Sequence, residues 1–213
     1  MKKSILVFAI ACGLMVSGHS YAQDSSRHKI RTIFRPGTSS GGYGALSNKF
    51  TTIRGQYANI AEVYGGWYVN HWFMIGLSAA AVTNNLPVPI ENSADPSLNL
   101  SYQYGQFGLM TEYVIGSGRA VHLAFSLFAG PGFTLQYQRY DFNNNNNRER
   151  HIRDENWFFV AEPGMHLEFN VLKWMRFSPG ISYRATAGSN ASGLSDSDLS
   201  NLSYNATLKF GRF

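Results

Sequence analysis

Alternation of apolar and polar side chains is the dominant pattern along this chain. Between positions 175 and 187 most odd positions are apolar, Phe177 and Ile181 among them, whereas the even positions carry polar or small residues. The same alternation recurs in 121–138 and in 157–171. Because successive side chains of a β-strand point to opposite faces, these segments are predicted to be strands with one apolar and one polar face.

Eight strands are predicted from the alternation and from the turn residues between the segments. They span residues 40–53, 56–69, 72–84, 98–115, 120–140, 156–172, 174–188 and 201–213. Most are longer than the usual five or six residues, which suits strands that cross a bilayer at a tilt, since such a crossing takes about 9 to 11 residues. The pattern therefore predicts an all-β chain: a single eight-stranded antiparallel up-and-down transmembrane β-barrel.

The fourth predicted strand changes phase near Gly105, and we expect a β-bulge there. The bulge would place six residues on one face: Leu100, Tyr102, Tyr104, Phe107, Leu109 and Tyr113.

The connections between the predicted strands alternate in kind. Those after the second, fourth and sixth strands are short, and those after the third, fifth and seventh are long and polar. In outer-membrane barrels the short turns face the periplasm and the long loops face outward. An even number of strands would place both ends of the barrel on the short-turn side.

The N-terminal residues have the layout of a secretory signal peptide. Two lysines precede an apolar run from 5 to 16, and Ser20 and Ala22 are the small residues expected at a cleavage site. Cys12, the single cysteine, lies in the apolar run, so a lipid-modified N-terminus is the alternative. The predicted organisation is a signal peptide at 1–22, an N-terminal periplasmic lead-in at 23–39 and the barrel at 40–213.

Composition narrows the function classes. The chain has 18 Lys and Arg against 13 Asp and Glu, and without the two lysines of the signal peptide the formal net charge falls from +5 to +3. So small an excess gives no support to nucleic-acid binding. Since no apolar stretch approaches the roughly 18 residues of a membrane helix, strands would have to make any membrane crossing.

The polar strand faces are rich in Gly, Ser, Asn and Gln and carry few charges, unlike a surface in water. This favours an apolar exterior in lipid over a soluble, lipocalin-like barrel with an apolar interior. The inward charges are predicted to form a structural network of Glu62, Glu112, Glu162, Glu168, Arg176, Arg184 and Lys209. An eight-stranded barrel is only wide enough for its own side chains, so we expect these groups to pair and fill the lumen. A gated ion path is the alternative.

Tryptophans lie near both ends of the predicted strands. Trp67, Trp72 and Trp174 are beside short turns, and Trp157 is near a long loop. Two aromatic girdles at the membrane interfaces would account for both groups. The alternative is that these rings belong to an ordinary β-sheet core.

Short motifs are spread over residues 40–213, among them Gly41-Gly42-Tyr43-Gly44-Ala45, Gly65-Gly66-Trp67, Glu162-Pro163-Gly164 and Lys209-Phe210-Gly211-Arg212-Phe213. They resemble the small eight-stranded outer-membrane β-barrel proteins of the OmpA, OmpX and OmpW type, in particular an uncharacterised branch of the outer-membrane β-barrel family. The resemblance implies an outer-membrane protein of undefined activity and supplies no catalytic residues. It also implies that Phe213 is a signal read by the barrel-assembly machinery.

Two groups of residues suggest chemistry. His122, His166, Ser126 and Glu168 share the inward face and resemble an acid-base or nucleophilic set, although packing in the lumen is the favoured interpretation. The polar tract 143–153 could recognise sugars or lipopolysaccharide, or could simply be a solvated loop.

Three function hypotheses follow. We favour a barrel with a filled lumen whose surface loops have a structural, adhesive or ligand-contact role. The alternatives are a narrow channel for small or apolar solutes and a lipid-modifying outer-membrane enzyme. The favoured hypothesis predicts no enzymatic activity, cofactor, metal or nucleic acid. Its partners would be outer-membrane lipid, lipopolysaccharide and the barrel-assembly machinery, with a monomer favoured.

Overall fold

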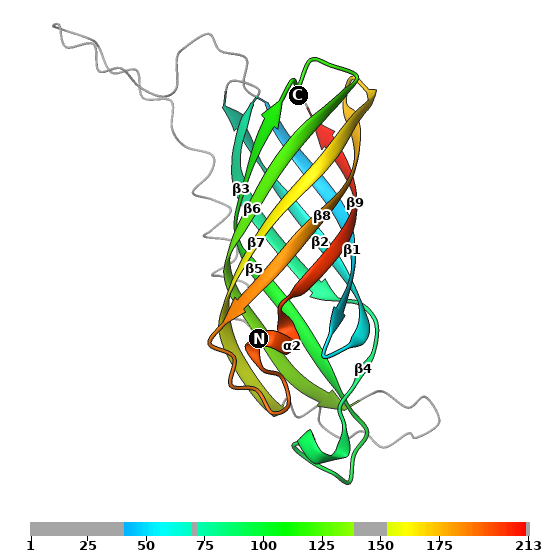
Figure 1. Cartoon of the computed structure of the whole chain (residues 1–213), viewed down its shortest axis with the longest axis vertical. Coiled ribbons are helices and arrows are strands. Elements are labelled where there is room, and N and C mark those ends of the chain that lie inside the picture. The colour runs from blue at the N-terminus through cyan, green and yellow to red at the C-terminus, as the bar shows by residue number, and fades with distance from the viewer. Residues whose placement is uncertain (1–40, 70–71, 139–152, 212–213) are drawn as a thin grey trace, which may run out of the picture. The chain divides into compact units, whose positions relative to one another are not determined.

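The computed structural model describes residues 41–69, 72–138 and 153–211, all within one compact unit of the chain. Its strands are β1 (Gly42–Ile53), β2 (Gln56–Val69), β3 (Phe73–Val82), β4 (Leu86–Pro87), β5 (Leu100–Ile115), β6 (Val121–Gln138), β7 (Arg153–Leu172), β8 (Met175–Ala187) and β9 (Asn201–Gly211) (Figure 1). Two short helices lie in the connections, the 3-10 helix η1 (Ile90–Asn92) and the α-helix α2 (Asp196–Leu199). Among the described residues, no helix combines the length and hydropathy needed to cross a membrane.

The sheet closes on itself. Neighbouring strands follow the order β3, β2, β1, β9, β8, β7, β6 and β5. The ring is closed because β3 also pairs with β5, from Phe73↔Tyr113 to Ala81↔Gly105. Every pairing is antiparallel, and β4 is attached to β5 alone, outside the ring of eight. The predicted single eight-stranded antiparallel barrel is therefore confirmed, and the β5–β6 and β7–β8 turns lie together at one end of it, opposite the β1–β2 turn (Figure 1).

The predicted strand boundaries agree with the structure to within a few residues, but the expected bulge in the fourth strand is wrong. β5 pairs with β6 in one register on both sides of Gly105. Tyr102 and Tyr104 point inward and are buried, whereas Phe107 and Leu109 point outward and are exposed. The side chains of β5 thus alternate between the two faces without a break. The apolar residues of the sequence change phase near Gly105 because the inner face of the barrel itself becomes apolar near the loop end.

The first hairpin closes in two residues. Arg54 and Gly55 both have positive φ, 51° and 71°. Two such residues in succession suit a tight hairpin whose twist matches that of the flanking strands. β1 and β2 therefore meet in a compact turn at the loop end.

β2 and β3 approach each other very closely where two glycines pair. Gly76 lies opposite Gly66, and a Cβ on Gly76 would overlap the carbonyl oxygen of Gly65. A residue with any side chain at this position would push the two strands apart, so glycine is required for the observed spacing.

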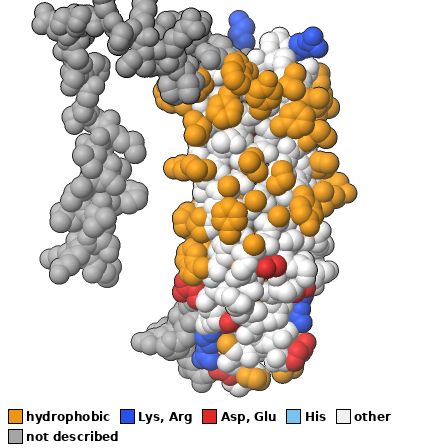
Figure 2. All heavy atoms as spheres, turned by 60° about the vertical axis from the view of Figure 1, so that its left-hand side comes forward, with side chains coloured by type: hydrophobic (Ala, Val, Ile, Leu, Met, Phe, Trp, Pro, Cys, Tyr) orange, Lys and Arg blue, Asp and Glu red, His pale blue; other side chains and the backbone are white. Residues whose placement is uncertain are grey.

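The two faces of the barrel wall have opposite character. On the outer face Phe125, Leu167 and Ile181 are 41%, 41% and 40% exposed, while Glu168 and Arg184 on the inner face are 0% and 1% exposed. Figure 2 shows apolar side chains spread over the upper part of the wall and charged ones toward its ends. The apolar exterior and polar interior expected from the sequence are both observed.

The wall is not equally tall all around. β3 has 10 residues, whereas β6 and β7 have 18 and 20. Part of the surplus lies toward the loop end, because β5 continues to Leu100, still paired with β6, beyond its last pairing with β3 at Gly105. The η1 and α2 connections are attached at this end.

Candidate functional site

The interior of the barrel holds equal numbers of acidic and basic side chains among the described residues. All seven predicted network residues are buried there, and so is Lys49, which was not predicted. With Lys49 included, four glutamates face four cations: Glu62, Glu112, Glu162 and Glu168, with Lys49, Arg176, Arg184 and Lys209. The charges of the interior therefore balance in number, which lowers the cost of burying them.

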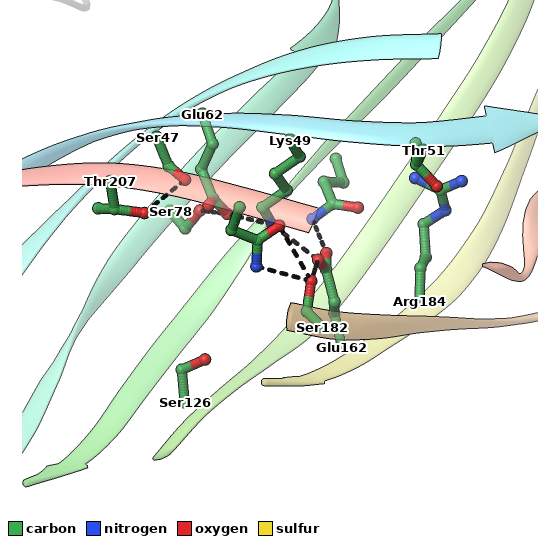
Figure 3. Close-up of polar contacts among 12 residues, drawn as sticks. Ser47, Lys49, Thr51, Glu62, Ser78, Ser126, Glu162, Ser182, Arg184 and Thr207 are labelled. Atoms are coloured by element: carbon green, nitrogen blue, oxygen red, sulfur yellow. Dashed lines mark hydrogen bonds and ion pairs between the residues drawn. The ribbon is translucent and has the colours of Figure 1, made fainter. Parts of the chain in front are cut away.

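Lys49 joins two glutamates in the middle of the lumen (Figure 3). Its Nζ lies 3.0 Å from Glu62 Oε1 and 2.8 Å from Glu162 Oε1. Ser78 donates to Glu62 at 2.8 Å, and Ser182 donates to Glu162 at 2.6 Å. These five side chains, here called the Lys49 cluster, come from five different strands, so the cluster ties the wall together across the lumen.

Lys209 forms a second cluster. Its Nζ lies 2.6 Å from Glu112 Oε1 and 2.5 Å from Glu168 Oε1. Glu168 also accepts a hydrogen bond from Arg176 at 3.2 Å and pairs with His122 Nε2 at 2.8 Å. We call these five residues the Lys209 cluster. Tyr43 and Tyr64 donate to Glu112, so both carboxylates are fully engaged.

Arg184 is the exception among the predicted charges, because it has no carboxylate partner within the described ranges. Its Nε donates to the carbonyl oxygen of Leu199 at 2.6 Å, and a terminal nitrogen donates to that of Thr52 at 3.3 Å. The guanidinium also lies 4.9 Å from the ring centroid of Tyr104. Arg184 therefore fastens the α2 connection to the barrel wall.

The loop end of the lumen is filled by apolar side chains. Leu194 and Leu199, from the connection between β8 and β9, are almost completely buried. They belong to one cluster with residues of the wall that includes Leu86, Tyr102, Tyr104, Phe158 and Val160. This apolar plug closes the loop end of the barrel, opposite the β5–β6 and β7–β8 turns.

The space beside the Lys49 cluster is very small. An enclosed cavity of about 10 Å³ lies beside the Lys49 cluster and is also lined by Tyr64, Ser126 and His166. This is about the volume that a single water molecule needs. The lumen has no room for a solute along this part of its length.

The four residues considered for catalysis form two separate pairs inside the barrel. Ser126 Oγ lies 3.0 Å from His166 Nε2, and His122 pairs with Glu168 in the Lys209 cluster. Since all four point inward, none reaches the outer wall where a lipid substrate would lie. No group of three or more potential metal ligands occurs among the described residues.

The η1 connection at the loop end is held to the strands of the wall by polar contacts. Arg153 of β7 lies 2.7 Å from Asp95, and Gln136 of β6 donates to the carbonyl oxygen of Asn92 at 2.9 Å. The hydrogen bonds from Ser97, with that from Arg153, hold the pKa of Asp95 below its usual value. A shallow depression of about 560 Å³ lies between Asn92 of the η1 connection and the residues that precede α2.

All four tryptophans lie on the outer wall, as the girdle hypothesis requires. Trp67, Trp72 and Trp174 are exposed near the short turns, and Trp157 is exposed toward the loop end. Trp157 packs against Phe133, with ring centroids 5.3 Å apart.

Some predictions lie outside the described residues. These are the signal peptide at 1–22, the lead-in at 23–39, the polar tract at 143–153 apart from Arg153, and Phe213. They remain predictions.

Solved structures match this chain, although no protein-family model and no curated protein does. Neisserial surface protein A has 7% sequence identity and a TM-score of 0.53, with 80% of this chain and 96% of that one covered. A major outer membrane protein from Thermus thermophilus has 9% identity and a TM-score of 0.51, covering 80% and 99%. This chain has the fold of the small outer-membrane β-barrels. The resemblance drawn from the sequence motifs is therefore confirmed at the level of fold.

Proposed function

We propose that this chain is an integral outer-membrane protein whose closed barrel anchors surface loops for a structural, adhesive or ligand-contact role. The observation that carries the proposal is the combination of an apolar outer wall with a filled, ion-paired interior. A soluble barrel would have the opposite arrangement, with charged residues outside.

The outer wall supports a location in lipid. Large apolar side chains on all eight strands of the ring are at least 39% exposed, from Leu46 on β1 to Leu208 on β9. A soluble monomer rarely exposes contiguous apolar patches beyond a few hundred Å². The tryptophans toward both ends of the wall suit the two interfaces of a bilayer. We propose outer-membrane lipid and lipopolysaccharide as the contacts of this wall.

The filled lumen supports an anchoring role over a channel. Two charge clusters span the interior, the apolar plug closes one end, and the cavity beside the Lys49 cluster has room for about one water molecule. The loop end, in contrast, presents polar connections, of which the η1 connection is bonded to the strands of the wall. We propose that function resides in this surface.

We propose no enzymatic role. Ser126 and His166 face the closed cavity and lie inside the wall. Replacement of either residue by alanine should leave the lipid composition of the host membrane unchanged.

Membrane integration can be tested on the full-length protein. The protein should float with outer-membrane vesicles in a sucrose gradient. It should also run at a different apparent mass on an SDS gel before and after boiling, because a closed barrel resists unfolding by the detergent. Equal mobility in both conditions, together with recovery from the soluble periplasm, would contradict the proposal.

Conductance separates an anchor from a channel. Purified protein in planar bilayers should give no conductance steps, in membranes where a pore-forming peptide added as a positive control gives clear ones. Regular steps from the wild-type protein would favour the narrow-channel alternative.

A further inference from the structure

A polar side chain lies on the outer wall among apolar ones. Asn48 of β1 points outward, between the exposed Leu46 and Phe50 on the same strand. Its neighbours across the sheet are Ala61 of β2 and Ala206 of β9. Because both neighbours are small, the amide is accessible to a surface that approaches the wall from outside.

Asn48 differs from other polar residues of the outer wall in its hydrogen bonding. Thr111 donates to the carbonyl oxygen of Leu127 at 3.3 Å, and Gln103 donates to that of Val82 at 3.0 Å. The Asn48 side chain has no such partner in the described part of the chain. In hydrocarbon an amide without a partner is unfavourable, since no water is present to replace one.

An apolar groove lies on the same face of the barrel. It has a volume of about 620 Å³ and is lined by Val63, Gly65, Leu77, Ala79 and Phe107 among others. Leu46, two positions from Asn48, lies directly opposite Val63 on the neighbouring strand. The amide, the projecting leucine and the groove therefore form one continuous surface, here called the Asn48 face.

A second copy of this chain fits the Asn48 face better than a lipid chain does. An acyl chain could fill the groove, but it would leave the amide unpaired. An asparagine amide both donates and accepts, so two of them related by a two-fold axis satisfy each other. A two-fold contact joins the same surface of both copies, so that surface must be complementary to itself. The Asn48 face meets this requirement because it has both a projecting leucine and a groove.

We propose that the Asn48 face is the interface of a homodimer within the membrane, in which the Asn48 amides of two copies hydrogen-bond to each other. This replaces the monomer favoured from the sequence, and it rests on the membrane location proposed above. Polar side chains and small residues are the features that hold membrane-embedded segments together.

Cysteine cross-linking tests which face meets the second copy. Asn48→Cys is introduced into the full-length chain, whose only other cysteine, Cys12, lies in the predicted signal peptide. The matched control is Leu123→Cys on the outer face of β6, four strands from β1 in either direction around the ring. With copper phenanthroline in phosphatidylcholine vesicles, the first variant should form disulfide dimers several times more readily than the second. Equal yields would overturn the proposal.

Energy transfer between labelled copies measures the contribution of the amide. Asn48→Leu should lower the association constant in vesicles about threefold to twentyfold, the range expected for hydrogen bonds between membrane segments. Thr111→Val is the control, because its hydroxyl is bonded within the barrel, and it should stay within about twofold of wild type.

Flotation and heat-modifiability of the same samples distinguish the two proposals. Protein that integrates but remains monomeric at every protein-to-lipid ratio would overturn the dimer alone. Protein that does not integrate would overturn the membrane location and the dimer together.

Discussion

Lys209 and Glu168 are in direct contact inside the barrel, with Nζ 2.5 Å from Oε1 and both side chains fully buried. Glu168 also contacts Arg176 and His122, so three basic side chains surround this one carboxylate. Removing its charge would leave cations in the interior with a single remaining carboxylate, Glu112, in the same cluster.

Glu168→Gln is therefore expected to destabilise the barrel by about 3 to 5 kcal/mol, the usual effect of breaking a buried ion pair from one side. The measurement is the free energy of unfolding by urea in lipid vesicles, followed by tryptophan fluorescence. Glu91→Gln, at an exposed site near Arg54, serves as the control and should change stability by less than about 0.5 kcal/mol. A loss below about 1 kcal/mol for Glu168→Gln would show that the cluster is not needed for stability.

Two glycine substitutions should have unequal effects. A Cβ on Gly76 would overlap the backbone of Gly65, whereas a Cβ on Gly105 would overlap only the ring of Phe133. Since the ring can move and the paired strand cannot, Gly76→Ala should cost at least about 3 kcal/mol and Gly105→Ala about 1 kcal/mol. The same unfolding assay measures both. Phe133→Ala should rescue Gly105→Ala, and equal costs at the two glycines would contradict this account.

Arg184→Lys keeps the charge but loses the planar group that reaches two carbonyl oxygens at once. The α2 connection should then open more often, and cleavage at Asp196 or Asp198 by an Asp-specific protease should become roughly tenfold faster, because a bond to a charged group contributes about 1.5 to 3 kcal/mol. Mass spectrometry of the folded protein's fragments identifies the sites. Arg119→Lys, on an exposed turn, is the control, and unchanged cleavage in Arg184→Lys would argue against the fastening role.

The contact between Asp95 and Ser97 should depend on pH in a definite direction. Because the pKa of Asp95 is lowered in the folded chain, the stabilisation from its contacts is complete above the ordinary value of about 3.9 and is lost as the pH falls through the lower, folded value. The backbone amide of Ser97 donates to Asp95 at 3.1 Å and reports the change by NMR. Its titration should have a midpoint below about 3.9. The transition should vanish in Asp95→Asn, and a midpoint above about 3.9 would contradict the prediction.

The strands and their faces could be predicted from the sequence because β6, β7 and β8 keep a period of two over most of their length, with register shifts only near Gln136 and near Leu172. Lys49 was missed for a related reason. The first strand is rich in small residues, such as Gly44 and Ser47, and its outward face has only two large apolar side chains, Leu46 and Phe50, so an inward lysine does not stand out. The sequence signal for its inward position is that Lys49 has the opposite parity to Leu46 and Phe50.

Tyr102 and Tyr104 were assigned to the wrong face because an apolar side chain was taken to mean the outer wall. That rule holds where the interior is polar. Near the loop end the interior is apolar, since Leu194 and Leu199 enter it from a connection that follows about 90 residues later. No local pattern in the fourth predicted strand contains that information. The short elements β4, η1 and α2 were missed because they are too brief to show a period.

The unequal height of the wall has a consequence for what the barrel presents at its loop end. β5 and β6 stay paired from Gly105 to Leu100, past the last pairing of β3, which corresponds to roughly 17 Å of strand toward the loop end. In the membrane location proposed above, the rim carried by β5 and β6 would be the first part of the wall that a large molecule approaching from the loop end meets. Substitutions on that rim would then alter such contacts while the residues of the apolar outer wall stay the same.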